Sequence, residues 1–92
     1  MRTFQFTIPA SGIVQFVVSD KPGASSYFQH AIIQNNNSGN IRIGGSTVTA
    51  TTGILLGPGT TYAIVLGLNQ RSIDQIYAQG TPGFLVDLVI VE

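Results

Sequence analysis

Hydrophobic and polar residues alternate at the start of the chain, and this alternation predicts a β-strand. In residues 2–8, Phe4, Phe6 and Ile8 fall on one face, whereas threonine and glutamine fall on the other. A period of two is typical of a strand with one buried face. No stretch of the sequence keeps the 3.6-residue period of an amphipathic helix, so the pattern favours strands throughout.

Turn residues divide the rest of the chain into further short strands. Gly and Asn tolerate left-handed backbone, and Pro fixes φ for a turn, so clusters of these residues mark the connections. One short helical turn is expected within residues 69–75, with Ser72 as a candidate cap. The expected strands cover residues 2–8, 13–18, 27–34, 41–43, 54–56, 61–68, 76–78 and 84–91, with a weaker pairing segment at 47–51.

Seven to eight short strands at regular spacing predict an all-β fold. We expect a small antiparallel β-sandwich, jelly-roll-like or Greek-key in its connections. Because the chain has 92 residues and no linker or repeat, we expect a single domain over residues 1–92. The expected core consists of Phe4, Phe6, Val14, Phe16, Ile32, Ile43, Ile64, Leu66, Val86, Leu88 and Ile90.

The composition is poor in charge, and this excludes several classes of function. Charged residues make up 9% of the chain and the formal net charge is zero, whereas an average domain has about 25% charged residues. A binder of nucleic acid needs clustered Lys and Arg, so we expect none. No apolar run approaches a membrane span of about 20 residues. A neutral, weakly charged surface associates readily, so we expect a protein that works in an assembly.

The residues that carry chemistry are few and dispersed. The chain has one histidine, His30, and no cysteine. Its carboxylates, Asp20, Asp74, Asp87 and Glu92, are not placed near His30 by their spacing, as a general base and its partner would be. The glycine pairs lack the spacing of a phosphate-binding loop. We therefore expect no catalytic residue, no metal site and no cofactor, and we do not expect an enzyme.

Two arginines and two tyrosines are the candidate partner contacts. Arg42 lies between two isoleucines and faces away from them, and Arg71 lies in a polar segment. Arginine is enriched at interface hot spots because its planar group makes several directed hydrogen bonds. Tyr27 and Tyr77 are candidates to anchor a protein or to stack on a sugar. The alternatives are a solvated charge for each arginine and a cap over the core for each tyrosine.

The order of motifs from Tyr27 to Glu92 resembles a module of tailed-bacteriophage structural proteins. The motifs are IIQNNNSGNIRIGGSTVTATTGILLGPGTTY, then SIDQIYAQG, then FLVDLVIVE. In that module a strand ends in a polar loop, and a short strand, paired glycines and a Leu-Gly-Pro-Gly turn follow. The resemblance covers about two thirds of the chain, and the first 26 residues carry none.

A separate chain of this size is similar to capsid decoration (cement) proteins. That resemblance implies a location on the outer surface of the virion capsid and binding to the major capsid protein, with neither nucleic acid nor membrane as a partner. It also implies a homo-oligomer, with a trimer favoured over a dimer because shell sites have local threefold symmetry. The alternative is a phage tail or fibre module that binds host-surface carbohydrate through tyrosines.

Overall fold

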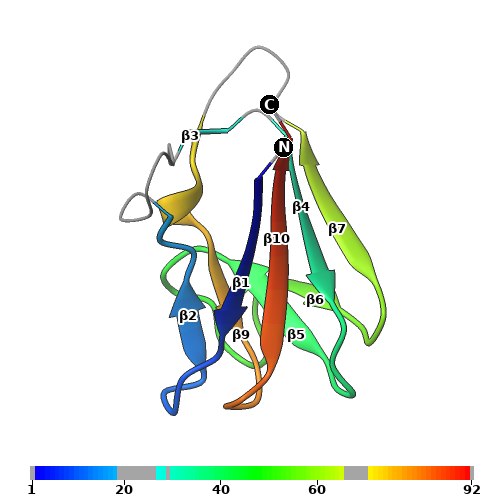
Figure 1. Cartoon of the computed structure of the whole chain (residues 1–92). Helices are drawn as coiled ribbons and strands as arrows, with labels where there is room; N and C mark the ends of the chain where they lie inside the picture. The colour runs from blue at the N-terminus through cyan, green and yellow to red at the C-terminus, as the bar shows by residue number, and fades with distance from the viewer. Residues whose placement is uncertain (1, 19–26, 29, 66–70, 92) are drawn as a thin grey trace.

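Two four-stranded antiparallel sheets make up the body of the molecule (Figure 1). The computed structural model describes residues 2–18, 27–28, 30–65 and 71–91. The first sheet has the strand order β1-β10-β4-β7 and the second has the order β2-β9-β5-β6, while β3 pairs with β8. The strands are β1 (Arg2–Thr7), β2 (Ile13–Gln15), β3 (Tyr27–Phe28), β4 (His30–Asn35), β5 (Ile41–Gly44), β6 (Ile54–Leu56), β7 (Thr61–Val65), β8 (Arg71–Ser72), β9 (Tyr77–Gln79) and β10 (Leu85–Val91).

The pairing of the strands is nested, and this order defines a jelly roll. When the short β3–β8 pair is set aside, the first strand pairs with the last, β1 with β10, and β2 pairs with β9. Inside these pairs, β4 pairs with β7 and β5 pairs with β6. Eight strands that wind as two Greek keys into two sheets form a jelly roll. The predicted all-β antiparallel sandwich is therefore confirmed.

Alternating residues on the facing sides of the two sheets form the core. In β10, Val86, Leu88 and Ile90 are buried, and the register places Leu88 between Phe4 and Ile33 on the neighbouring strands. The predicted core residues Phe16, Ile43, Val86, Leu88 and Ile90 are all buried. Phe4, Phe6, Val14 and Ile64 are half-buried and pack against the core. Leu66 lies outside the described residues.

The predicted inward face of the strand around Ile32 was wrong. Ile32 is half-buried on the outer face, whereas Ala31 and Ile33 are fully buried. Three consecutive apolar residues fit either phase of the alternation, and a shift of one residue exchanges the two faces. Pairing with β10 selects the phase, because Ile33 lies opposite Leu88 and Ala31 opposite Ile90.

Several predicted strand boundaries also differ from the structure. The segment 13–18 is a strand only as far as Gln15, although Phe16 and Val18 are buried as expected. Residues 47–51 form no strand; they lie in a loop closed by threonine side chains. The predicted helical turn is confirmed as the 3-10 turn η1 (Ile73–Gln75), and the side chain of Ser72 lies outside what the structure describes.

One buried polar side chain ties the two sheets together. Asn35, at the end of β4, is fully buried, and its Nδ2 donates to the carbonyl oxygens of Leu56 in β6 and of Gly39, each at 2.9 Å. Its Oδ1 accepts from the backbone N–H of Asn37 at 3.0 Å and from Asn37 Nδ2 at 2.9 Å. Because buried polar groups cost free energy unless they are paired, this set of bonds holds the 36–40 turn against the second sheet.

Candidate functional site

The outer face of the second sheet carries two of the four candidate contact residues. In β5, Ile41 and Ile43 are buried, so Arg42 projects outward. In β9, Ala78 is buried, so Tyr77 and Gln79 project outward. This alternation follows directly from the period of two in a strand. The prediction that Arg42 faces away from its two isoleucine neighbours is confirmed.

The strand register places Arg42 in a row of outward side chains. Arg42 lies opposite Gln79 on β9 and opposite Leu55 on β6, and Gln79 lies opposite Ile13 on β2. Tyr77 belongs to the next row, opposite Gly44. Directly opposed residues on one face are close enough for their side chains to interact. Arg42 is therefore flanked by an amide on one side and by an aliphatic side chain on the other.

The guanidinium of Arg42 is held at one end by the loop that comes after β5. Nη1 donates to the carbonyl oxygen of Gly53 at 3.1 Å. Nε is buried and has no hydrogen-bond partner among the described residues. An arginine has five N–H donors and no acceptor, so one bond leaves most of the donors of Arg42 without a protein partner in this part of the chain.

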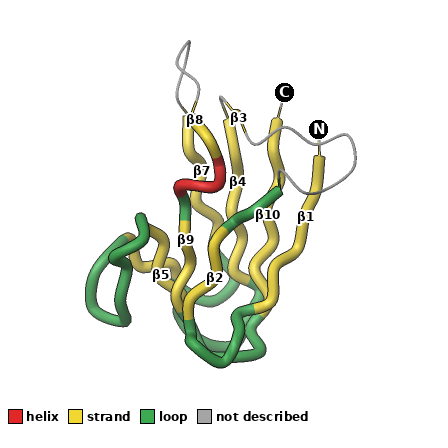
Figure 2. The backbone as a smooth tube through the Cα atoms, turned by 90° about the vertical axis from the view of Figure 1, so that its left-hand side faces the viewer, coloured by secondary structure: helices red, strands yellow, loops and turns green. Residues whose placement is uncertain are grey.

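The loop of residues 45–53 is closed by its own side chains and projects beside β5 (Figure 2). The hydroxyls of Thr49 and Thr52 lie 2.8 Å apart, and the backbone N–H of Thr52 donates to Thr49 Oγ1 at 3.1 Å. Val48 is buried beneath the loop. Hydroxyl side chains that bond to nearby backbone in this way favour turns over strands. These local bonds hold the loop that carries the Gly53 carbonyl. Because that carbonyl accepts a hydrogen bond from Arg42 Nη1, the loop also orients the guanidinium.

Gly53 should be the most sensitive glycine of this loop. Its φ is +103°, and an added Cβ would lie 2.8 Å from the carbonyl oxygen of Ile43 and 2.8 Å from Val48 Cγ2. The left-handed backbone and the crowding together should cost an alanine at this position about 1–3 kcal/mol. We expect Gly53→Ala to lower the free energy of unfolding by about 1–3 kcal/mol, measured by urea denaturation.

Gly45→Ala is the matched control for that change in the same loop. An added Cβ at Gly45 meets no atom within 4 Å, and its φ is not left-handed. We expect its effect to stay within about 0.5 kcal/mol. Equal midpoints for the two variants would contradict the strained geometry assigned to Gly53.

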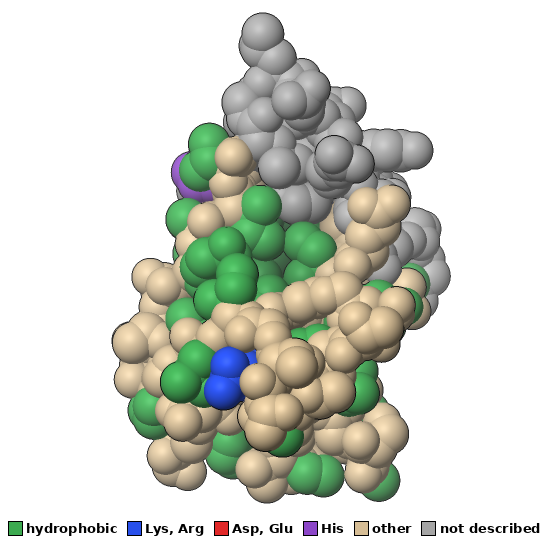
Figure 3. Space-filling view, turned by 180° about the vertical axis from the view of Figure 1, so that it is seen from behind, with side chains coloured by type: hydrophobic (Ala, Val, Ile, Leu, Met, Phe, Trp, Pro, Cys, Tyr) green, Lys and Arg blue, Asp and Glu red, His purple; other side chains and the backbone are tan. Residues whose placement is uncertain are grey.

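An open groove of about 320 Å³ lies beside Arg42. Its walls come from three separate parts of the chain: the start of β5, the end of β9 with the turn after it, and β6 with the 45–53 loop. Of the described residues that line it, Arg42 is the charged one. On the side of the molecule seen in Figure 3, the described surface shows one small basic patch and no acidic side chain. The lining residues are Asn40, Arg42, Ala50, Leu55, Gln79, Gly80 and Thr81.

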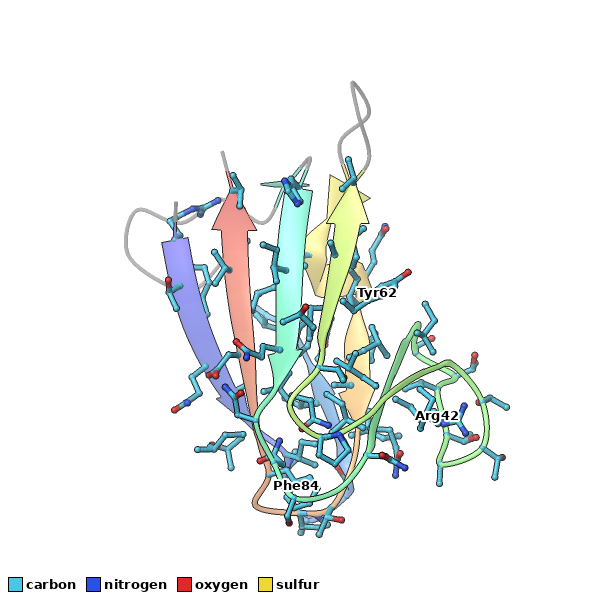
Figure 4. All side chains as sticks on the ribbon, turned by 90° about the vertical axis from the view of Figure 1, so that its right-hand side faces the viewer. Arg42, Tyr62 and Phe84 are labelled. Atoms are coloured by element: carbon cyan, nitrogen blue, oxygen red, sulfur yellow. The ribbon has the colours of Figure 1, made fainter. Side chains whose placement is uncertain are left out.

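The tyrosines do not gather at this groove. Tyr77 is half-buried in the neighbouring row, and Tyr62 on β7 is half-buried and packs against the core. Figure 4 shows Tyr62 and Arg42 well separated. Tyr27 in β3 lies opposite Ser72, and Arg71 in β8 lies opposite Phe28, but the structure does not describe the side chains of Tyr27 and Arg71. Of the candidate contacts, the structure therefore brings only Arg42 and Tyr77 to one face.

Sequence reasoning missed the other residues of the groove. Gln79 and Leu55 reach Arg42 only through the register of β9 and β6, and Ala50 reaches the groove only through the path of the 45–53 loop. The sequence alone does not show which residues of these three segments lie opposite one another, because the register depends on how the folded sheet aligns the strands. The sequence signal for Gln79 is its place next to the apolar Ala78, which indicates an outward side chain if Ala78 faces the core.

The outer face of the first sheet is apolar at one end and polar at the other. His30 lies on it opposite Val91 and Val65, with no carboxylate in that row. Further along, both carboxylate oxygens of Asp87 accept hydrogen bonds from amides, Oδ1 from Gln5 Nε2 at 2.9 Å and Oδ2 from Asn36 Nδ2 at 2.8 Å. Asp87 points outward between the buried Val86 and Leu88, and its carboxylate belongs to a surface network of side-chain amides.

Comparison with known proteins identifies no relative. The chain matches no family model, no curated protein and no solved structure at a significant level. Among the described residues, no group of three or more His, Cys, Asp or Glu lies close enough together to hold a metal ion. No helix in the described part of the chain is long and apolar enough to span a membrane. The function of this chain therefore has to be inferred from its own residues.

Proposed function

We propose that the chain is a non-enzymatic structural subunit of a tailed-bacteriophage virion. It binds the outer surface of the assembled head, where the major capsid protein is its partner, and stabilises contacts between capsomers. The observation that carries the proposal is the low charge of the two outer sheet faces. Among the described side chains of these faces, Arg42 and Asp87 are the charged groups, apart from the titratable His30.

Uncharged polar and aliphatic side chains make these faces suitable for broad protein contacts. Val65 on β7 is 68% exposed and Leu55 on β6 is 53% exposed, and both strands are edges of their sheets. Edge strands usually carry charges, prolines or bulges that prevent pairing with other chains, whereas the residues of β7 are Thr-Tyr-Ala-Ile-Val. Desolvating such a surface costs less than desolvating a charged one.

Two further observations support the same proposal. The motif order from Tyr27 to Glu92 resembles phage structural modules, and jelly rolls recur in viral capsid and lectin domains. A fold alone does not define a function, so the fold supports the proposal only together with the surface. The proposal includes a homo-oligomer, with a trimer favoured over a dimer, because repeated weak contacts at a threefold site add up through avidity.

Heads that lack the protein should rupture more easily than heads that carry it. A ligand that binds only the assembled state stabilises that state. We expect heads of the encoding phage without this protein to release DNA at a lower temperature, measured with a DNA-binding dye. Purified protein should restore the rupture temperature, even at several hundred millimolar salt, since few ion pairs contribute. A chelator should not change the result.

A small neutral protein unrelated to the phage is the control for this addition. Equal rupture temperatures with and without the bound protein would overturn the cementing role. Binding to host-surface glycans without binding to heads would instead favour a tail or fibre module. Tyr77 would then be the first residue to replace, because it is the outward tyrosine among the side chains that the structure describes.

A further inference from the structure

The guanidinium of Arg42 gives the groove hydrogen-bond donors that suit an anion. Nη1 of Arg42 donates to Gly53 and Nε is buried, so the remaining guanidinium N–H groups are the donors that Arg42 can offer to a ligand in the groove. The other lining groups are amides, a hydroxyl, backbone and aliphatic carbon. Asp87 lies on β10 in the other sheet. Both of its carboxylate oxygens accept hydrogen bonds from side-chain amides there. Among the described residues that line the groove, none is a carboxylate that could neutralise Arg42.

We propose that this groove binds the carboxylate of an Asp or Glu side chain on an extended segment of a partner protein. A guanidinium and a carboxylate form charge-assisted hydrogen bonds, which are shorter and stronger than neutral ones. Gln79, directly opposite Arg42, offers a side-chain amide on the β9 side of the guanidinium. The bond to Gly53 orients the guanidinium before the ligand arrives, so less conformational entropy is lost on binding.

The flanks of the groove favour a peptide over an acidic sugar. Leu55 on β6 is 53% exposed and lines the groove, and Ala50 lines it from the 45–53 loop. These aliphatic groups can cover the apolar neighbours of an acidic residue in a peptide. Sugar rings stack on aromatic faces, and the described part of the groove lining contains no aromatic residue.

The inference rests on the proposed function only in expecting the partner to be the capsid protein. One ion pair per subunit is compatible with weak salt dependence of binding to the head, because the other contacts are uncharged. The groove itself can be tested on the purified chain without any virion. Success or failure of the two proposals can therefore be told apart.

The test is a titration of the ¹⁵N-labelled protein with two capped peptides, followed by NMR. One probe is the N-acetylated, C-amidated pentapeptide Thr-Leu-Glu-Leu-Thr, and the other has Gln in place of Glu. We expect the Glu peptide to shift the Arg42 Nε–H signal and the backbone amides of Gln79 and Leu55. Loss of one charge-assisted hydrogen bond should weaken binding of the Gln peptide about ten-fold.

Two variants assign the effect to the guanidinium. Arg42→Gln should reduce binding of the Glu peptide to that of the Gln peptide, and Arg42→Lys should keep part of the difference because it keeps the charge. If Arg42→Gln disturbs the 45–53 loop, the comparison of the two peptides on the unaltered protein still decides the matter.

Three results would overturn the inference. They are equal shifts from both peptides, shifts confined to residues outside the groove, and no shift from either peptide up to its solubility limit. Galacturonate that shifts the same signals at lower concentration than the Glu peptide would also overturn it, in favour of a sugar-acid site. Peptide binding by a protein that does not protect heads would leave the groove assigned and refute the capsid role.

Discussion

Replacement of Phe16 by alanine is expected to lower the free energy of unfolding by about 3–5 kcal/mol. The Phe16 side chain is fully buried, and its ring stacks on that of Phe6 with the centroids 5.0 Å apart. The lost ring removes apolar contacts and leaves a cavity between the sheets. Small domains have about 5–15 kcal/mol of stability, so the variant should lose a large share of it and unfold at a much lower urea concentration, as measured by far-UV circular dichroism.

Val65→Ala is the control for the Phe16 change. Val65 is 68% exposed on an edge strand, so its truncation creates no cavity, and the expected effect is within about 0.5 kcal/mol. If Phe16→Ala unfolds at the same urea concentration as Val65→Ala, Phe16 does not fill the space between the sheets and the core is assigned wrongly.

Asn35→Ala is expected to lower the free energy of unfolding by about 2–5 kcal/mol, although it removes only a few atoms. The side chain makes four hydrogen bonds, and its loss leaves the buried carbonyl oxygen of Leu56 without this donor. A hydrogen bond contributes about 0.5–1.5 kcal/mol net to stability, so the loss of the four bonds accounts for an effect of this size. Urea denaturation measures the total.

The matched change is Asn36→Ala, one residue further along the chain. Asn36 is exposed and donates to Asp87 at the surface, so we expect it to cost less than about 1 kcal/mol. Asn35→Asp keeps the volume of the side chain but replaces its donor by an oxygen that faces two carbonyl oxygens. It should therefore be no more stable at neutral pH than Asn35→Ala. A fully stable Asn35→Asp would contradict the role of Nδ2.

Alternation predicted strand faces well where apolar residues occur at every second position. In β1 the apolar residues stand two apart, and in β10 the charged Asp87 sets the phase of an otherwise apolar run, so Phe4, Phe6 and Val86 face inward as expected. In β4, apolar residues at 31, 32 and 33 leave the phase open, and pairing with β10 decides it. Tertiary pairing, which a single sequence does not contain, is the missing information.

The candidate site was only partly predictable for a related reason. The direction of Arg42 follows from its two isoleucine neighbours, which is local information. The groove around it joins residues 40–42, 50–55 and 79–81, and their proximity depends on sheet order and on a threonine-closed loop. The sequence at 47–51 favoured a strand because Thr and Val have high β-propensity. In the structure, the Thr49 hydroxyl accepts a hydrogen bond from the backbone N–H of Thr52, and the segment forms a loop.

The nested pairing of the strands determines when the chain is able to fold. β10 occupies the middle of its sheet, between β1 and β4, and it is synthesised after all the other strands. Until residues 85–91 have left the ribosome, β1 and β4 have no common neighbour, and their apolar faces stay exposed. Contacts between residues so distant in sequence form slowly, and the waiting chain is prone to aggregate. The nested pairing therefore makes folding of this jelly roll wait for its last strand, β10.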